Sequence, residues 1–93
     1  MNLRYYIDPE TAAPHIHNHR VSEAEVEEVL TRPGEDRPAQ DGARMAIGQT
    51  SSGRFLRVIY VPDPKPGSVF VITAYELTGK ALLAYRRRRR RKR

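Results

Sequence analysis

The clearest hydrophobic pattern in the chain is a short apolar stripe at helical spacing, formed by Val26, Val29 and Leu30. Directly before it, Ser22-Glu23-Ala24-Glu25 matches a capping box, in which the serine hydroxyl accepts from a free backbone N–H and the glutamate accepts from the serine N–H. Val21 is placed to complete a hydrophobic staple with Val26. Pro33-Gly34 ends the pattern. The sequence therefore predicts a helix from about Glu23 to Thr31.

Three segments further along the chain have strand character: Arg44–Thr50, Arg54–Val61 and Ser68–Glu76. The first two are separated by Ser51-Ser52-Gly53, a hairpin signal, and the last two by a proline-rich turn over 62–67. The second and third segments are apolar on both sides, which is typical of strands inside a sheet. The polar stretch 34–43 contains Pro38 and Gly42 and is expected to be a loop.

The two ends of the chain complete the predicted architecture. Residues 3–7 fit either a short strand or the lead-in to a helical segment around 9–13. Thr78 is placed to cap a last helix whose apolar face carries Ala81, Leu82 and Tyr85. We therefore predict an α+β fold: an antiparallel three-stranded meander, or four-stranded if 3–7 joins it, flanked by an N-terminal helical segment and a C-terminal helix. Residues 1–85 would form one domain, and 86–93 a basic tail that extends the last helix.

Composition limits the class of protein. The 93 residues include no cysteine, so disulfides, thiolate metal sites and a cysteine nucleophile are excluded. The longest strongly apolar stretch, Val69–Tyr75, is far shorter than the roughly 20 residues that a spanning helix needs. Met1–Ile7 is too short and polar for the apolar part of a signal peptide. We expect a cytoplasmic protein with no membrane partner and make no prediction of its oligomeric state.

The positive charge is concentrated at one end. Of 17 lysines and arginines, eight lie in 86–93, whereas residues 1–85 carry nine basic and eleven acidic residues, a net charge of −2. Such a tail can capture RNA or DNA by its phosphates, contact an acidic segment of a partner protein, or only keep the chain soluble. Arginines at i and i+4 repel one another, so the helix is expected to fray beyond about Arg88 unless phosphates or carboxylates neutralise it.

A family resemblance covers roughly residues 15–86. It is carried by His19-Arg20-Val21-Ser22 leading into the glutamate-rich helix, by Arg44 with Ile47–Ser51, by Gly53–Tyr60, and by Val71-Ile72-Thr73-Ala74-Tyr75. In these features the chain resembles the BrnT-like toxin family of bacterial type II toxin–antitoxin systems and an adjoining family of uncharacterised small domains. Both are similar to the wider RelE/ParE group.

The resemblance implies an RNA-cleaving toxin, acting with or without the ribosome, that a cognate antitoxin protein keeps silent. One feature departs from the pattern of BrnT-like proteins. They tend to have arginine after the Ser/Thr-Ala of the last strand, whereas this chain has Tyr75 and Glu76. A carboxylate therefore stands where a phosphate contact is expected. This departure favours the alternative function, a non-catalytic nucleic-acid-binding or protein-interaction module that uses the tail.

Metal-independent RNA cleavage needs a base for the ribose 2′-OH, an acid for the leaving 5′-oxygen, and cations for the charge that develops on phosphorus. Arg54 and Arg57 lie on opposite faces of the second strand, because strand side chains alternate. Arg57 stands between apolar Phe55 and Ile59 and so requires a carboxylate, such as one from the acidic helix, or a phosphate, or else a place on the open face of the sheet. Arg54, next to the hairpin, fits the rim of a binding surface or a solvated position.

Glu76 is a candidate general base, or else a partner of Lys80, and Tyr75 can stack on a nucleobase or cover the edge of the core. His19 is a candidate acid or base, since free imidazole exchanges protons near neutral pH. His15, His17 and His19 would share one face of an extended segment, a spacing that could chelate zinc, but alternating histidines are usually solvated. We predict no metal and no cofactor. The predicted site residues are Arg57, Tyr75, Glu76 and His19 for catalysis, and Arg54, Arg86, Arg87, Arg88, Arg89, Arg90 and Arg91 for nucleic-acid binding.

Overall fold

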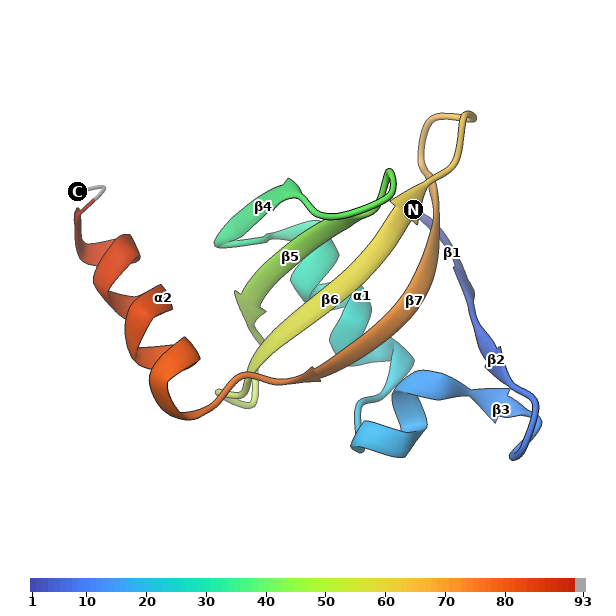
Figure 1. The fold of residues 1–93 in the computed structure, drawn as a ribbon, viewed down its shortest axis with the longest axis horizontal. Coiled ribbons are helices and arrows are strands. Elements are labelled where there is room, and N and C mark those ends of the chain that lie inside the picture. The colour runs from blue at the N-terminus through green and yellow to red at the C-terminus, as the bar shows by residue number, and fades with distance from the viewer. Residues whose placement is uncertain (92–93) are drawn as a thin grey trace.

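The computed structural model describes residues 1–91. The elements in chain order are β1 (Asn2–Tyr5), β2 (Ile7–Asp8), β3 (Ala13–Pro14), the 3-10 helix η1 (His15–His19), α1 (Glu23–Thr31), β4 (Glu35–Pro38), β5 (Arg44–Gln49), β6 (Phe55–Pro62), β7 (Ser68–Glu76) and α2 (Gly79–Arg91). Figure 1 shows α1 crossing behind the central strands and α2 lying beyond one side of the sheet. In this part of the chain, no helix is both long and apolar enough to cross a membrane.

The sheet has five strands in the order β1-β7-β6-β5-β4, and β1 runs parallel to β7 while the other pairs are antiparallel. The fold is α+β, but the predicted three-stranded or four-stranded antiparallel meander is wrong: the sheet is mixed, and β2 and β3 form a separate two-stranded ribbon. The three predicted strands are present as β5, β6 and β7. The helix predicted from about Glu23 to Thr31 is present as α1, whereas the alternative of a helical segment around 9–13 is wrong, because this region belongs to the ribbon that precedes η1.

Both added strands lie at the edges of the sheet. β4 lies where a loop was expected. Its sequence, Glu-Asp-Arg-Pro, has low intrinsic strand propensity, since charged residues and proline are tolerated in strands mainly at the edge of a sheet. β1 pairs with a strand 66 residues later, Asn2 with Ser68 and Tyr5 with Val71. Such a long-range parallel pairing has no local sequence signal.

The main core lies between α1 and one face of the sheet. Ser22 and Glu25 form the predicted capping box, with both reciprocal hydrogen bonds. Val21 and Val26 are both buried, as the staple requires. The core continues through residues from α1, η1 and the sheet, which include Ile16, Val29, Ala46, Leu56, Val58, Val71 and Ala74. These contacts fix which face of β6 is covered.

A smaller apolar cluster joins α2 to the other face of the sheet. Its buried members are Ile47 of β5, Tyr85 of α2, and Leu77 between β7 and α2, with Phe55 packed against them. The Tyr85 ring fits tightly over Gly34, because a Cβ built at Gly34 would lie 1.9 Å from the Tyr85 hydroxyl. α2 therefore covers only the end of this face near β4 and β5, and leaves the middle of the sheet uncovered.

Candidate functional site

The open face is the side of the sheet opposite α1. Along β6 the side chains alternate: Leu56, Val58 and Tyr60 are buried in the α1 core, whereas Arg57 and Ile59 are half-buried on the open face. Arg57 therefore points away from the acidic helix, which rules out the ion pair with an acidic residue of α1. Within residues 1–91 no salt bridge to Arg57 is present, although eight are found elsewhere.

The nearest polar neighbour of Arg57 is Tyr75, which is directly opposite it across the β6–β7 pair. Arg57 Nη1 donates to the Tyr75 hydroxyl at 3.3 Å, and its guanidinium carbon lies 5.9 Å from the Tyr75 ring centre. The Arg57 Nε is buried without a hydrogen-bond partner in the described chain. A half-buried guanidinium with one neutral acceptor keeps most of its donors for an anion.

His19, at the end of η1, contacts the Tyr75 member of this pair. Its ring meets the Tyr75 ring edge-on at 5.9 Å, and it also contacts the His15 ring at 5.2 Å. The left-handed backbone of Arg20 (φ 59°) ends η1 directly after His19, at the end of β7. Tyr75 thus contacts two other residues that the sequence analysis predicted to be catalytic, and we name His19, Tyr75 and Arg57 the catalytic cluster after that prediction.

A groove of about 700 Å³ begins at Arg57 and Tyr75. Its floor is apolar, made by Ile59, Val61 and Ile72, and its far wall is the hairpin loop 39–43. A β-bulge shifts the register with β7 between Ile59, which lies opposite Thr73, and Tyr60, which lies opposite Val71, so that Ile72 is the extra residue of β7. A groove of this size with cation and phenol at one end can hold one or two nucleotides.

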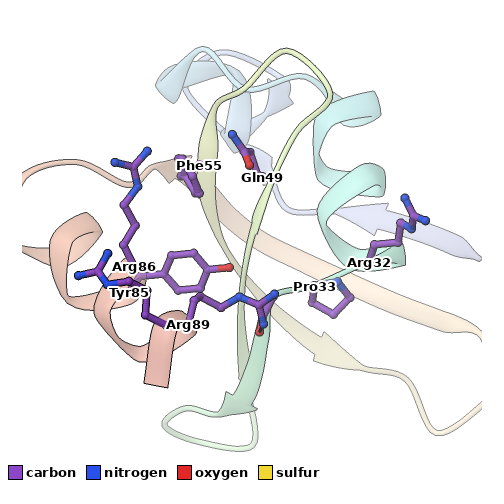
Figure 2. A pocket seen from close by; sticks show the side chains of 9 residues that line it. Arg32, Pro33, Gln49, Phe55, Tyr85, Arg86 and Arg89 are labelled. Atoms are coloured by element: carbon purple, nitrogen blue, oxygen red, sulfur yellow. Dashed lines mark hydrogen bonds between the residues drawn. The ribbon is translucent and has the colours of Figure 1, made fainter. Parts of the chain in front are cut away.

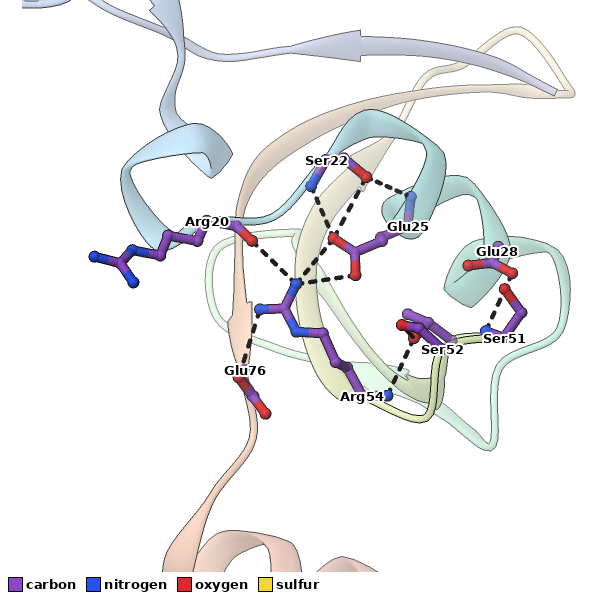
Figure 3. A network of polar contacts seen from close by, with 9 residues as sticks. Arg20, Ser22, Glu25, Glu28, Ser51, Ser52, Arg54 and Glu76 are labelled. Carbon is purple, nitrogen blue, oxygen red and sulfur yellow. Dashed lines mark hydrogen bonds and ion pairs between the residues drawn. The ribbon is translucent and has the colours of Figure 1, made fainter.

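Glu76 and Arg54 lie elsewhere, on the α1 side of the sheet (Figure 3). Arg54 Nη1 donates to both Glu25 oxygens, at 3.0 and 2.9 Å, and to the backbone oxygen of Arg20 at 3.0 Å. Its other nitrogen is 3.5 Å from Glu76, which is therefore paired with Arg54 rather than Lys80 in the described chain. These ion pairs hold Arg54 in the structure and place Glu76 on the opposite face of β7 from Tyr75.

The six arginines Arg86–Arg91 continue α2 as a regular helix. The predicted fraying beyond Arg88 is not seen up to Arg91. A carboxylate neutralises one of the arginines, because two nitrogens of Arg88 form an ion pair with the buried Glu35 side chain. That hydrogen bond raises the pKa of Arg88. Arg89 donates to the Gly34 backbone oxygen at 2.9 Å. The tail residues 92 and 93 lie outside the described part.

Glu35→Gln is expected to lower the free energy of unfolding by about 1–2 kcal/mol, because a charge-assisted pair becomes a neutral one beside a partly exposed guanidinium. It should also loosen α2, which far-UV circular dichroism and amide exchange would detect together with urea unfolding. Asp41→Asn makes the same chemical change on an exposed residue of the neighbouring loop and should alter stability by less than about 0.5 kcal/mol. Equal effects of both substitutions would contradict this role of Glu35.

The histidines do not share an extended face, because residues 15–19 form a 3-10 helix. His17 instead contacts Glu23 at 2.8 Å, and His15 contacts Asp8 at 3.3 Å. Across residues 1–91 no group of three or more potential ligands is placed to hold a metal ion. Sequence reasoning missed Tyr6, whose ring meets His15 and extends the row of rings behind His19. Only the long-range pairing of β1 with β7 brings it there.

Comparison with protein families gives one match. The model "Domain of unknown function (DUF4258)" matches residues 12–76, well over half of the chain. The chain belongs to this family. The DUF4258 region runs from the start of β3 to the end of β7, so it contains the whole catalytic cluster but not α2. Searches of curated proteins and of solved structures find no match to this DUF4258 protein.

Proposed function

We propose that this DUF4258 protein is a toxin-type endoribonuclease that cleaves RNA without a metal, by attack of the ribose 2′-OH on the adjacent phosphate. One observation carries the proposal: the half-buried Arg57 lies on the open face without a carboxylate partner among residues 1–91, in contact with Tyr75, whose ring in turn contacts His19. Leaving a charge so placed is unfavourable unless an anion binds there. The resemblance to BrnT-like toxins supports the same reading.

In this mechanism each group of the cluster has one role. His19, which is exposed, takes the proton of the 2′-OH as the 2′-oxygen attacks phosphorus. Arg57 donates to the non-bridging oxygens as negative charge develops on them. The bond from phosphorus to the 5′-oxygen breaks, and the Tyr75 hydroxyl gives that oxygen its proton. The products are a 2′,3′-cyclic phosphate and a free 5′-hydroxyl, and water returns the protons to their starting positions.

The test is bacterial growth after tightly controlled induction, with the Arg57→Ala/Tyr75→Ala double variant alongside. Wild type should arrest growth and the double variant should not, at equal levels of folded protein. Lys65→Ala, which removes one charge from an exposed turn, is the control and should still arrest growth. With purified protein, an oligoribonucleotide should be cut to a cyclic phosphate, and the same oligonucleotide with 2′-deoxyribose at the cut position should survive. Normal growth with abundant folded wild type would reject the active toxin in that host.

The second candidate is a non-catalytic nucleic-acid-binding module, favoured by the ordered arginine face of α2. It predicts binding that is lost when residues 86–93 are deleted, without cleavage. In either case the partners we propose are RNA, free or on the ribosome, and a cognate antitoxin protein, and the place of action is the cytoplasm. Co-purification with the product of a neighbouring gene would test the antitoxin.

A further inference from the structure

A second pocket, of about 550 Å³, lies between α2 and the ends of β5 and β6 (Figure 2). We call it the arginine pocket and define it by Gln49, Phe55, Tyr85, Arg86, Arg89 and Arg90. Four of the nine residues that line it are arginines, and no acidic residue belongs to this lining within the described chain. The Arg32 guanidinium points away from Arg86 in Figure 2, so the three arginines of α2 supply the charge.

These three arginines share one helix face because they are spaced i, i+3 and i+4. Like charges at this spacing repel. The nearby Glu35 carboxylate forms its ion pair with Arg88, which lies on a different face of α2 from the three pocket arginines. Arg86 lies over the Phe55 ring at 4.9 Å, and the Phe55 ring meets Tyr85 edge-on at 6.0 Å. The pocket thus combines three arginines that form no ion pair within residues 1–91, two aromatic rings and the Gln49 amide, which together suit a phosphate with its nucleoside.

The pocket and the catalytic cluster are neighbours on the same sheet face. Phe55 and Arg57 are two residues apart on β6, so both side chains point to the open side, with Cα atoms roughly 6–7 Å apart. One extended strand of nucleic acid is long enough to contact both. The backbone of α2 is held in place by Arg88 and Glu35, so the arginine face is presented as a fixed surface rather than as a flexible tail.

We propose that the arginine pocket binds the phosphates of single-stranded RNA next to the cleaved bond, and so gives this protein its affinity for RNA longer than a dinucleotide. This proposal rests on the proposed ribonuclease function for the identity of the ligand. It assigns substrate binding to one face of α2, with contacts that read the backbone rather than the base sequence.

The experiment measures binding of a fluorescent 12-nucleotide oligouridylate that carries 2′-O-methyl groups, which remove the nucleophile and so separate binding from cleavage. Arg86→Gln/Arg90→Gln is compared with Arg87→Gln/Arg91→Gln. Each variant changes two arginines spaced i, i+4 and removes two charges, and none of the four arginines forms an ion pair within residues 1–91. Only the first pair lines the pocket. Thermal unfolding of both variants controls for structure.

The first variant should bind on the order of tenfold more weakly at 0.1 M salt, and the slope of log affinity against log salt should fall by about 1.4, or ~0.7 for each lost phosphate contact. The second variant should change affinity much less. Equal losses in both variants, absence of wild-type binding, or displacement of the oligonucleotide by polyglutamate at matched charge would each overturn the proposal. Cleavage of a dinucleotide by the wild-type protein tests the ribonuclease separately from the binding of longer RNA, so a failed pocket and a failed ribonuclease give different results.

Discussion

Replacing Arg57 by methionine should lower the rate of RNA cleavage about 100- to 1,000-fold and leave the protein as stable as wild type or slightly more stable. The loss of rate is the effect expected from removing one donor to a developing oxyanion. Stability should hold because Arg57 forms no salt bridge within residues 1–91 and lies beside apolar Ile59, where a methionine of similar length packs well. Single-turnover cleavage and urea unfolding on the same samples measure the two quantities.

Arg54→Met is the matched control, because it is the same substitution three residues earlier on the other side of the sheet. It removes the ion pairs to Glu25 and Glu76, so the free energy of unfolding should fall by about 2–3 kcal/mol. Cleavage by the folded fraction should be close to wild type. A rate loss that is as large in Arg54→Met, or a stability loss that is as large in Arg57→Met, would contradict the separation of a catalytic arginine from a structural one.

Local signals account for the parts of the fold that sequence could predict. The capping box at Ser22 and the staple at Val21 depend on residues a few positions apart, so α1 and its bounds were predicted correctly. The hairpin between β5 and β6 and the helix after Thr78 have similar short-range signals. β1 and β4 have none, because they are edge strands whose order comes from the strands beside them. A mixed five-stranded sheet was therefore beyond the reach of the pattern alone.

The candidate site also has features that local sequence patterns predict and features that they do not. Alternation on β6 placed Arg54 and Arg57 on opposite faces, and alternation on β7 separated Tyr75 from Glu76, as the structure shows. It did not say which face α1 covers, and that choice decides which arginine is paired with a carboxylate and which forms no ion pair within residues 1–91. The contact of His19 with Tyr75 and the arginine pocket both join elements far apart in sequence, and neither has a signal in spacing.

Glu25→Ala should lower the free energy of unfolding by about 2–4 kcal/mol, a large share of the stability of a domain this size. The side chain accepts from the Ser22 N–H at 3.0 Å, which completes the capping box, and from Arg54 through both oxygens. Loss of the cap costs about 1 kcal/mol, and loss of the partner of a largely buried guanidinium adds the remainder. Urea unfolding at neutral pH measures the difference, which corresponds to a fall in melting temperature of roughly 10 °C or more.

Glu27→Ala is the control on the same helix, since Glu27 is exposed, and it should change stability by less than about 0.5 kcal/mol. The pH dependence gives a second check. Burial alone would raise the pKa of Glu25, but the Ser22 N–H and the Arg54 guanidinium outweigh it and hold the pKa below its usual value of 4.5. The carboxylate therefore stabilises the fold fully above pH 4.5, and this contribution is lost as pH falls through the lowered pKa. The gap between wild type and Glu25→Ala should narrow over that acidic range, and a gap that stays constant from pH 7 to pH 3 would show that the ionised carboxylate is not what stabilises the helix start.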